Sequence, residues 1–221
     1  MSKKIEVGKK ILSANEEYAQ QNSKFLTENK KLCLNMISSP GSGKTSILTR
    51  TITELKGRIA MGVIEGDICT ELDAQRIRET NAPAIQIETQ GSCHLSASQI
   101  TGALDKLPIN DLDLIFIENV GNLVCPTAFE LGENAKIVVL SVPEGDDKPA
   151  KYPGIFAKSK AMLINKIDLL TMVDFDIDKV VAQAKKLNPG IEIFQVSAKT
   201  GQGFQHWSNW LIESVKALQL Q

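Results

Sequence analysis

The chain has 221 residues, of which 43% are hydrophobic and 23% charged, and its formal net charge is −1. This length suits one α/β domain with a small appendage, and the balanced charge argues against a surface for nucleic acid or anionic membranes. The first ten residues are basic but lack the apolar run of a signal peptide, and no stretch is apolar for long enough to cross a bilayer. The four cysteines are widely spaced, as is typical of cytoplasmic thiols.

The first 30 residues are expected to form an amphipathic helix. Apolar side chains recur there mostly at steps of three and four, at Val7, Ile11, Ala14, Tyr18 and Phe25. We interpret this stripe as the face of a helix docked on the domain that occupies residues 31–221. A membrane or partner function for this helix is the less favoured reading.

The rest of the chain alternates predicted strands with predicted helices. Apolar, β-rich runs predict strands at 32–38, 60–66, 84–89, 113–118, 136–142, 161–165 and 192–197. Helical segments are predicted at 44–56, 70–80, 95–107, 149–158, 175–187 and 204–219. Such alternation predicts an α/β fold, a mostly parallel sheet with helices on both faces. Ligands of such sheets bind at the carboxyl ends of the strands.

The segment SSPGSGKTS lies between the first predicted strand of the sheet and the helix that follows, which is the setting of a P-loop. Its glycines let backbone N–H groups approach phosphate oxygens, and the start of the helix adds its dipole. Lys44 would reach the β- and γ-phosphates, and the Thr45 hydroxyl would bind Mg²⁺. The usual pattern begins with glycine, but this chain has Ser38 there. The predicted phosphate-binding residues are Gly41, Ser42, Gly43, Lys44, Thr45 and Ser46.

Two further motifs indicate guanine as the base. NKID ends the predicted strand at 161–165, and the Asp168 carboxylate can accept hydrogen bonds from the N1–H and the exocyclic amine of guanine. Asn165 belongs to the same motif, and the aliphatic stem of Lys166 can cover the base. SAK follows the next strand and can offer guanine O6 a backbone N–H; its residues are Ser197, Ala198 and Lys199. The order of P-loop, NKxD and SAK therefore predicts GTP and GDP as ligands.

Six segments in this order carry a resemblance to a known family: SSPGSGKT, EGDICTELDAQRI, CHLSAS, ENVGNLVCP, LSVPEGDDKPAKYP and NKID. The chain closely resembles the hydrogenase-maturation nickel-incorporation GTPases, the HypB family of SIMIBI-type P-loop proteins. The resemblance implies a nickel chaperone that hydrolyses GTP, dimerises with GTP, and helps to insert nickel into [NiFe]-hydrogenase. We expect slow turnover, because the sequence shows no evident arginine finger near the phosphate loop. The implied partners are a nickel-binding accessory protein and the hydrogenase large-subunit precursor.

This chain departs from many family members at two places. It has neither the N-terminal CxxCGC motif nor a histidine-rich stretch, and Ser96 stands where an acidic residue commonly follows CHL. The first departure argues against a high-affinity terminal nickel site and a nickel-storage role. The second weakens a possible auxiliary contact but not the family resemblance.

Two carboxylates are expected near the Mg²⁺ ion. Asp67 follows the predicted strand at 60–66, and Glu118 ends the one at 113–118, so both carboxylates point at the ligand edge of the sheet. In the resembling family, the GD and ExxG segments that contain them act as switches. We assign both, with Thr45, to the Mg²⁺ shell, and Lys44, Thr45 and Glu118 to catalysis. Gly121 completes ExxG and can offer the γ-phosphate a backbone N–H. For Asp67 the alternative is a helix cap, and Asp73 is only a weak candidate for a general base.

A second metal site is expected at Cys93, His94 and Cys125, in two loops that leave the same edge of the sheet. Thiolate and imidazole suit Ni²⁺ or Zn²⁺. Taken alone, the Cys-His pair is better explained by a small buried cysteine and an exposed loop histidine than by a metal site. The family resemblance, with Cys125 in ENVGNLVCP, favours the metal. Cys33 is expected in the core, and Cys69 is left unassigned.

Two other functions remain open at this point. The related urease accessory GTPases also handle nickel, but they typically carry a Cys-Pro-His motif, whereas Cys93 and His94 are adjacent. The second alternative is a metal-binding adaptor in which GTP is a structural switch that is not hydrolysed.

Overall fold

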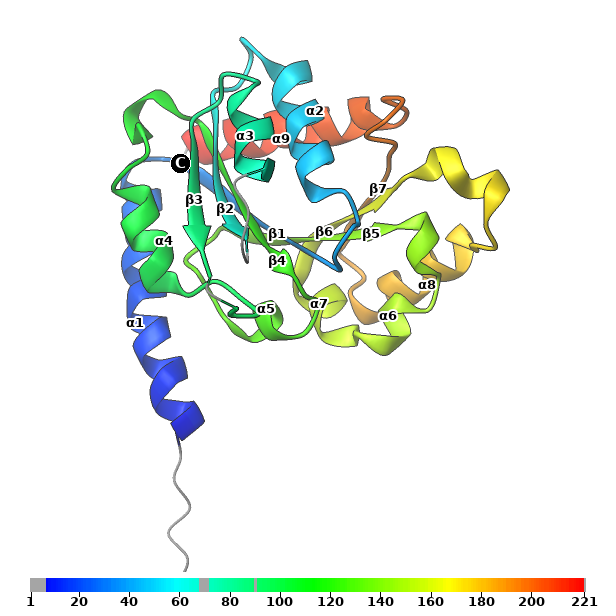
Figure 1. Cartoon of the computed structure of the whole chain (residues 1–221), viewed down its shortest axis with the longest axis horizontal. Helices are drawn as coiled ribbons and strands as arrows, with labels where there is room; N and C mark the ends of the chain where they lie inside the picture. The colour runs from blue at the N-terminus through cyan, green and yellow to red at the C-terminus, as the bar shows by residue number, and fades with distance from the viewer. Residues whose placement is uncertain (1–6, 68–71, 90, 221) are drawn as a thin grey trace, which may run out of the picture.

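A computed structural model describes residues 7–67, 72–89 and 91–220, with side chains for all of these except 7–11, 67 and 72–74. Seven strands form one sheet in the order β3-β2-β4-β1-β5-β6-β7, and every pairing is parallel (Figure 1). The α/β fold and all seven predicted strands are thereby confirmed. The strands are β1 (Leu32–Ser38), β2 (Met61–Asp67), β3 (Ala84–Glu88), β4 (Leu114–Gly121), β5 (Ala135–Ser141), β6 (Ser159–Asn165) and β7 (Glu192–Gln195).

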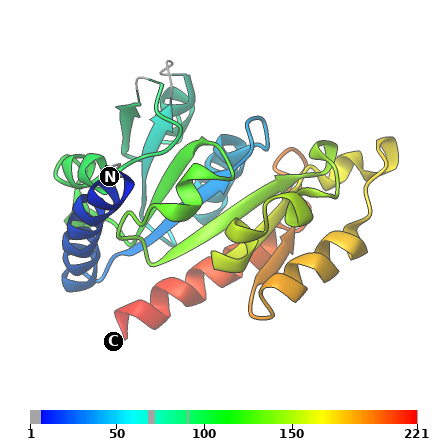
Figure 2. The ribbon, with the colours of Figure 1, turned by 90° about the horizontal axis from the view of Figure 1, so that it is seen from below.

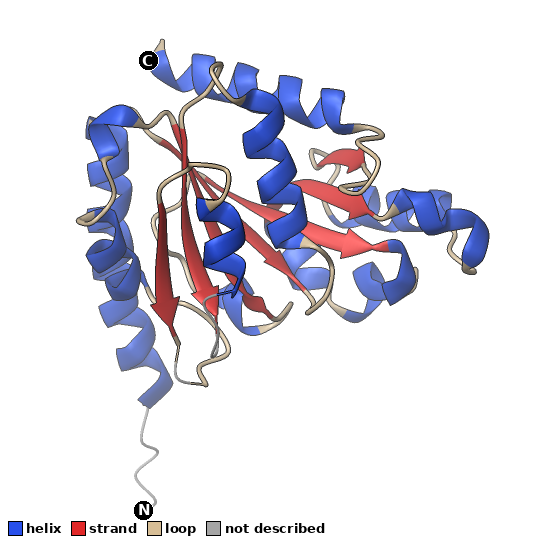
Figure 3. Ribbon diagram, turned by 45° about the horizontal axis from the view of Figure 1, so that its top comes forward, coloured by secondary structure: helices blue, strands red, loops and turns tan. Residues whose placement is uncertain are grey.

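Helices cover both faces of the sheet, as predicted (Figure 3). They are α1 (Val7–Glu28), α2 (Lys44–Leu55), α3 (Leu72–Arg78), α4 (Ala97–Leu104), α5 (Cys125–Ala128), α6 (Lys148–Lys151), α7 (Pro153–Lys158), α8 (Ile177–Leu187) and α9 (Phe204–Gln219). The predicted helix 149–158 is divided in two, because Tyr152 precedes a proline and leaves the helical region at φ −127° and ψ 53°. The four-residue α5 was not predicted, since one turn carries no periodic signal.

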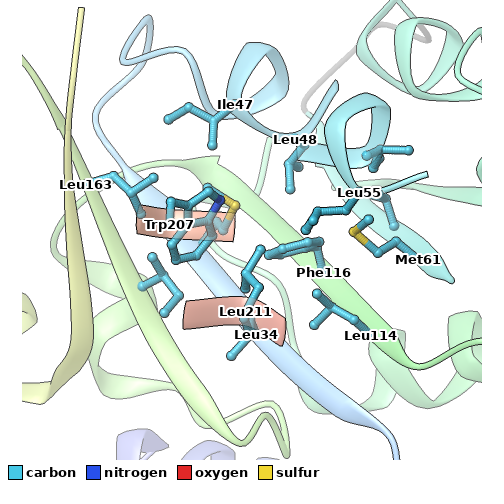
Figure 4. Close-up of a cluster of buried hydrophobic side chains, with 14 of the residues drawn as sticks. Leu34, Ile47, Leu48, Leu55, Met61, Leu114, Phe116, Leu163, Trp207 and Leu211 are labelled. Carbon is cyan, nitrogen blue, oxygen red and sulfur yellow. The ribbon is translucent and has the colours of Figure 1, made fainter. Parts of the chain in front are cut away.

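The first core layer lies between the sheet and helices α2 and α9. Figure 4 shows Trp207 and Leu211 of α9 beside Phe116 and Leu34 of the sheet. Trp207 is fully buried, and its indole N–H donates to the Thr51 hydroxyl of α2 at 3.0 Å. The C-terminal helix is therefore fixed to the helix that follows the phosphate loop.

The opposite face carries α1 and α4 at one end of the sheet and α7 and α8 at the other. Leu26 of α1 and Ile100 of α4 pack on Cys33, Ile115 and Ile117. The stripe predicted to dock α1 was wrong in part, because Ala14 and Tyr18 are exposed. Among the described side chains of α1, the buried ones are Asn15, Ala19, Asn22 and Leu26. Burial raises the pKa of the Cys33 thiol well above its usual value, and Glu133 raises it further, which agrees with its expected place in the core. Helices α1 and α4 lie side by side in both views (Figures 1 and 2). Across the described residues, no helix combines the length and apolarity needed to span a membrane.

The central strand β1 lies between β4 and β5. Its pairing with β4 places Met36 opposite Glu118 and Ser38 opposite Gly121, with a register shift between the two pairs. The segments after β1, β4, β6 and β7 therefore leave the same edge of the sheet, where parallel sheets bind ligands.

Candidate functional site

The phosphate loop connects β1 to α2 and is tied to the end of β6. Gly41 and Gly43 have φ of 76° and 91°, which side chains with a Cβ rarely adopt. A Cβ on Gly43 would also lie 2.6 Å from the amide nitrogen of Asn165. That amide donates to the Ser42 carbonyl at 2.9 Å, and Lys166 Nζ donates to the Gly41 carbonyl at 2.6 Å. The motif predicted to read the base thus also shapes the loop predicted to hold the phosphates.

The start of α2 presents a positive side chain and free helix N–H groups to this loop. The helix begins after Gly43 without a side-chain cap, so its first N–H groups can bind an anion. Lys44 is only 8% exposed, and its ammonium group donates to the Ser38 hydroxyl at 3.0 Å. Because a hydroxyl is neutral, Ser38 orients Lys44 without cancelling its charge. The serine that replaces the usual glycine therefore has a structural role that the motif alone did not reveal.

Oxygen ligands suited to Mg²⁺ lie beside the phosphate loop. The buried Thr45 hydroxyl donates to Glu118 Oε1 at 2.9 Å, which joins α2 to β4. A hydroxyl and a carboxylate in contact at a helix start fit a hard cation that also binds phosphates. Glu65 of β2 lies opposite Glu118 in register and is buried, a second carboxylate that the sequence did not indicate. Asp67 ends β2, but its side chain lies outside the described residues, as does that of Asp73.

Gly121 lies where β4 passes the phosphate loop. A Cβ at this position would lie 2.9 Å from Cα of Pro40, so any larger residue would push β4 away from the loop. The close approach agrees with a backbone contact to the γ-phosphate, which remains a prediction. Ser46 is exposed on the first turn of α2.

The two motifs predicted to read guanine come together. The Ser197 hydroxyl donates to Asp168 Oδ1 at 2.6 Å and accepts from the backbone N–H of Thr200 at 3.1 Å. The N–H of Ala198 donates to Asn165 Oδ1 at 3.1 Å. The predicted hydrogen bond from this N–H to guanine O6 would therefore have to be shared with the Asn165 oxygen or take its place. Lys199 is exposed.

Arg50 of α2 also contacts the SAK loop, and sequence reasoning did not find it. Its guanidinium donates to the Ala198 carbonyl at 3.4 Å and to Glu54 at 2.7 Å, and it lies 5.5 Å from the ring centre of Phe204. A Cβ on Gly201, whose φ is 88°, would collide with this guanidinium. No sequence pattern links Arg50 to a loop 148 residues away.

The three predicted soft ligands form a cluster. One donor atom from each of Cys93, His94 and Cys125 lies within 4.8 Å of the other two, and Cys93 Sγ is 3.5 Å from His94 Nδ1. A hydrogen bond with the Cys125 side chain raises the pKa of Cys93, with burial adding to it, while burial lowers the pKa of His94. Neutral imidazole is the form that binds metals. The cluster therefore has a donor set fit for Ni²⁺ or Zn²⁺.

The histidine of this cluster is held by an aromatic ring. His94 stacks on Phe129, with ring centroids 3.8 Å apart and an interplanar angle of 30°. Phe129 follows α5, which begins at Cys125, so the contact joins the two loops that supply the ligands. Cys69, left unassigned from the sequence, lies outside the described residues.

A buried polar chain joins the cluster to β4. Asn119 Oδ1 accepts the backbone N–H of Leu95 at 3.4 Å, next to His94. Its amide nitrogen donates to Asn35 Oδ1 of β1 at 3.2 Å. Asn119 directly follows Glu118, the carboxylate bound to Thr45. Only its place beside Glu118 in ENVGN could have drawn attention to it in the sequence.

Comparison with known proteins agrees with this geometry. The family described as "CobW/HypB/UreG, nucleotide-binding domain" matches residues 33–195. The hydrogenase maturation factor HypB of Escherichia coli K12 is 50% identical over 207 residues, covering 94% of this chain and 71% of that protein. The hydrogenase/urease maturation factor HypB of Helicobacter pylori J99 is 42% identical over 219 residues, covering 96% of this chain and 89% of that protein. The crystal structure of HypB from Helicobacter pylori in complex with nickel is 39% identical, with TM-score 0.88, and covers 92% of this chain and 96% of that one.

Proposed function

Because the chain belongs to the HypB family of nucleotide-binding domains, we propose that it is a Mg²⁺-dependent GTPase that delivers nickel into [NiFe]-hydrogenase during maturation. One observation carries the proposal: the Cys93, His94 and Cys125 donors converge within 4.8 Å on the loops beside the strand that contacts the phosphate loop. A nucleotide site and a soft-metal site thus share one edge of the sheet. We place the protein in the cytoplasm, where GTP and reduced thiols are available.

Lys44 and the α2 N-terminus bind and stabilise the negative charge on the β- and γ-phosphates. Thr45 and Glu118, with Asp67, would hold Mg²⁺, which when bound supplies further charge neutralisation on the phosphate oxygens. Asp168 and Lys166 hold guanine, with Ser197 orienting the carboxylate. We expect slow turnover, because Arg50 is engaged by Glu54 and the Ala198 carbonyl at the base-binding end.

Nickel is the cargo of the second site. Among the described residues, three donors converge, one short of a closed tetrahedral site, so the fourth position can be taken by water, by a second protomer or by a partner. Such a site can release its ion. We propose a GTP-promoted homodimer that receives nickel from a nickel-binding accessory protein and passes it to the hydrogenase large-subunit precursor.

The urease-type alternative keeps the same chemistry with another acceptor, and it stays open because one relative is named for both hydrogenase and urease maturation. Capture assays with purified hydrogenase large-subunit precursor and with urease apoprotein would separate the two. The adaptor alternative predicts tight GTP binding with no phosphate release at any metal load.

Phosphate release from GTP tests the proposal. We expect Lys44→Ala to lose nearly all turnover while its circular dichroism spectrum is unchanged, because the main positive side chain at the transferring phosphoryl group is gone. Cys125→Ala should retain turnover in the absence of nickel but bind Ni²⁺ more weakly. Hydrolysis by Lys44→Ala at the unmutated rate would show that the phosphate loop has been misread.

A further inference from the structure

Helix α1 carries two buried amide side chains on one face. Asn15 is 8% exposed and Asn22 is 2% exposed, and seven residues, or about two helical turns, separate them. A buried amide is costly unless its hydrogen bonds are satisfied. Both amides are satisfied by the same two segments of the domain, and those segments carry the metal ligands.

Asn15 bridges the two segments by itself. Its Oδ1 accepts the backbone N–H of Ala97 at 2.8 Å, and its Nδ2 donates to the Glu130 carbonyl at 2.7 Å. Ala97 lies three residues after His94, and Glu130 lies five residues after Cys125. A single side chain therefore sets the distance between the backbones that lead to the two loops of the cluster.

Asn22 repeats the bridge two turns farther along the helix. Its Nδ2 donates to the carbonyls of Ala97 and Leu131, each at 2.9 Å, and its Oδ1 accepts the Thr101 hydroxyl at 2.7 Å. The close approach depends on Gly132, since a Cβ there would lie 2.5 Å from Cβ of Asn22. The helix thus bonds both the segment after His94 and the segment after Cys125, once through Asn15 and again through Asn22.

The backbone groups that the two amides hold are close in sequence to residues that contact the metal ligands. Phe129, which precedes Glu130, stacks on His94, and Leu95, which follows His94, is held by Asn119. A change in the spacing of the segments would move the imidazole relative to the Cys125 thiol. Groups that hydrogen-bond directly to metal ligands typically change metal affinity by about 10–100-fold, and groups that act on the ligands through the backbone should have a smaller effect in the same direction.

We infer that Asn15 and Asn22 are positioning residues for the metal cluster, so that α1 sets the separation of the Cys93–His94 loop from the Cys125 segment. This inference rests on the proposed function, since it presupposes that the cluster binds nickel. It gives α1 a role beyond covering apolar surface, because apolar packing alone would not require two amides aimed at the same pair of segments.

Nickel titration of the full chain tests the inference. Ni²⁺ is titrated in competition with a chromophoric chelator, in the GDP-bound state, and the thiolate-to-nickel absorption band is recorded. We expect Asn15→Ala to bind Ni²⁺ about threefold to tenfold more weakly with a shifted band, because the amide acts on the ligands only through the backbone, and Asn22→Ala to change both readouts in the same direction. GDP affinity should stay within about twofold, because neither amide touches the nucleotide site.

Two matched controls separate positioning from general destabilisation. Gln21→Ala changes an exposed neighbour on the same helix, and Leu211→Ala removes a buried side chain on the opposite face of the sheet. Both should keep the nickel affinity and the band, although Leu211→Ala lowers the melting temperature. If Asn15→Ala does not fold, Asn15→Asp replaces it, because it keeps the acceptor for Ala97 and loses the donor to Glu130.

Unchanged nickel affinity and band in the folded Asn15 and Asn22 variants would overturn the inference. An equal loss of nickel affinity in Leu211→Ala would also overturn the inference, since the loss would then be explained by lower stability of the fold. Cys93→Ala and Cys125→Ala report on the proposed function separately. If they bind nickel like the unmutated protein, the cluster is not the nickel site, whereas if only they lose nickel, the cluster stands and the role of α1 falls.

Discussion

At the scale of single residues, we propose that base choice depends on the carboxylate of Asp168. A carboxylate offers two acceptors to the N1–H and the exocyclic amine of guanine, a donor pair that adenine lacks. Ser197 donates to Asp168 Oδ1 at 2.6 Å, which fixes the plane of the carboxylate. On this proposal, selectivity for guanine depends on one acceptor pair and on the hydroxyl that orients it.

Asp168→Asn should lower GTP affinity by at least one power of ten, or roughly 1.4 kcal/mol, because an NH₂ group would face the guanine amine. Xanthine carries an oxygen in place of that amine, so affinity for xanthosine triphosphate should rise in the same variant. Titration of labelled GTP, XTP and ATP measures all three. Equal affinity of the unmutated protein for ATP and GTP would contradict the assignment of guanine.

At the scale of elements, α2 serves both ends of the nucleotide site. Its first turn carries Lys44 and Thr45, the residues predicted to contact the phosphates, while Arg50, farther along, donates to the Ala198 carbonyl. Thr51 accepts the indole N–H of Trp207, so α9 holds this helix against the sheet. A rigid helix can thus keep the phosphate loop and the SAK loop at a constant separation.

Arg50→Met should weaken GTP binding by roughly threefold to tenfold, because one hydrogen bond from a charged group to the SAK loop is lost. Inosine triphosphate keeps O6 but lacks the exocyclic amine, so its affinity should fall by the same factor. Asp168→Asn, in contrast, should affect GTP more than ITP. Glu54→Gln is the control, since Arg50 can still reach Ala198. A loss confined to GTP would contradict the role given to Arg50.

At the scale of the whole molecule, β4 connects the two proposed sites. Successive side chains of a strand point to opposite faces, so Glu118 reaches Thr45 on the α2 face while Asn119 reaches Leu95 on the α4 face. After β4 ends at Gly121, the chain reaches Cys125 through residues 122–124. A shift of Glu118 in response to the nucleotide would therefore be transmitted to both loops of the metal cluster.

We predict that nickel affinity differs between the GDP state and the state with a non-hydrolysable GTP analogue. A plausible coupling is about 1–3 kcal/mol, and nickel must then change nucleotide affinity by the same factor. Calorimetry in both states measures it, with dimerisation followed in parallel. Asn119→Ala should reduce the ratio of the two affinities. Identical nickel affinity in both nucleotide states would end the coupled-carrier hypothesis.

The sequence alone predicted the seven strands, their parallel pairing and the grouping of the motifs at one edge of the sheet. Strands buried on both faces are continuous apolar runs, and binding loops carry glycines and charges at set spacings. Contacts that depend on packing could not be predicted: Asn15 meets Glu130 across 115 residues and Arg50 meets Ala198 across 148. Periodicity encodes which face of an element is buried, but only the packed elements decide which polar side chain meets which backbone group.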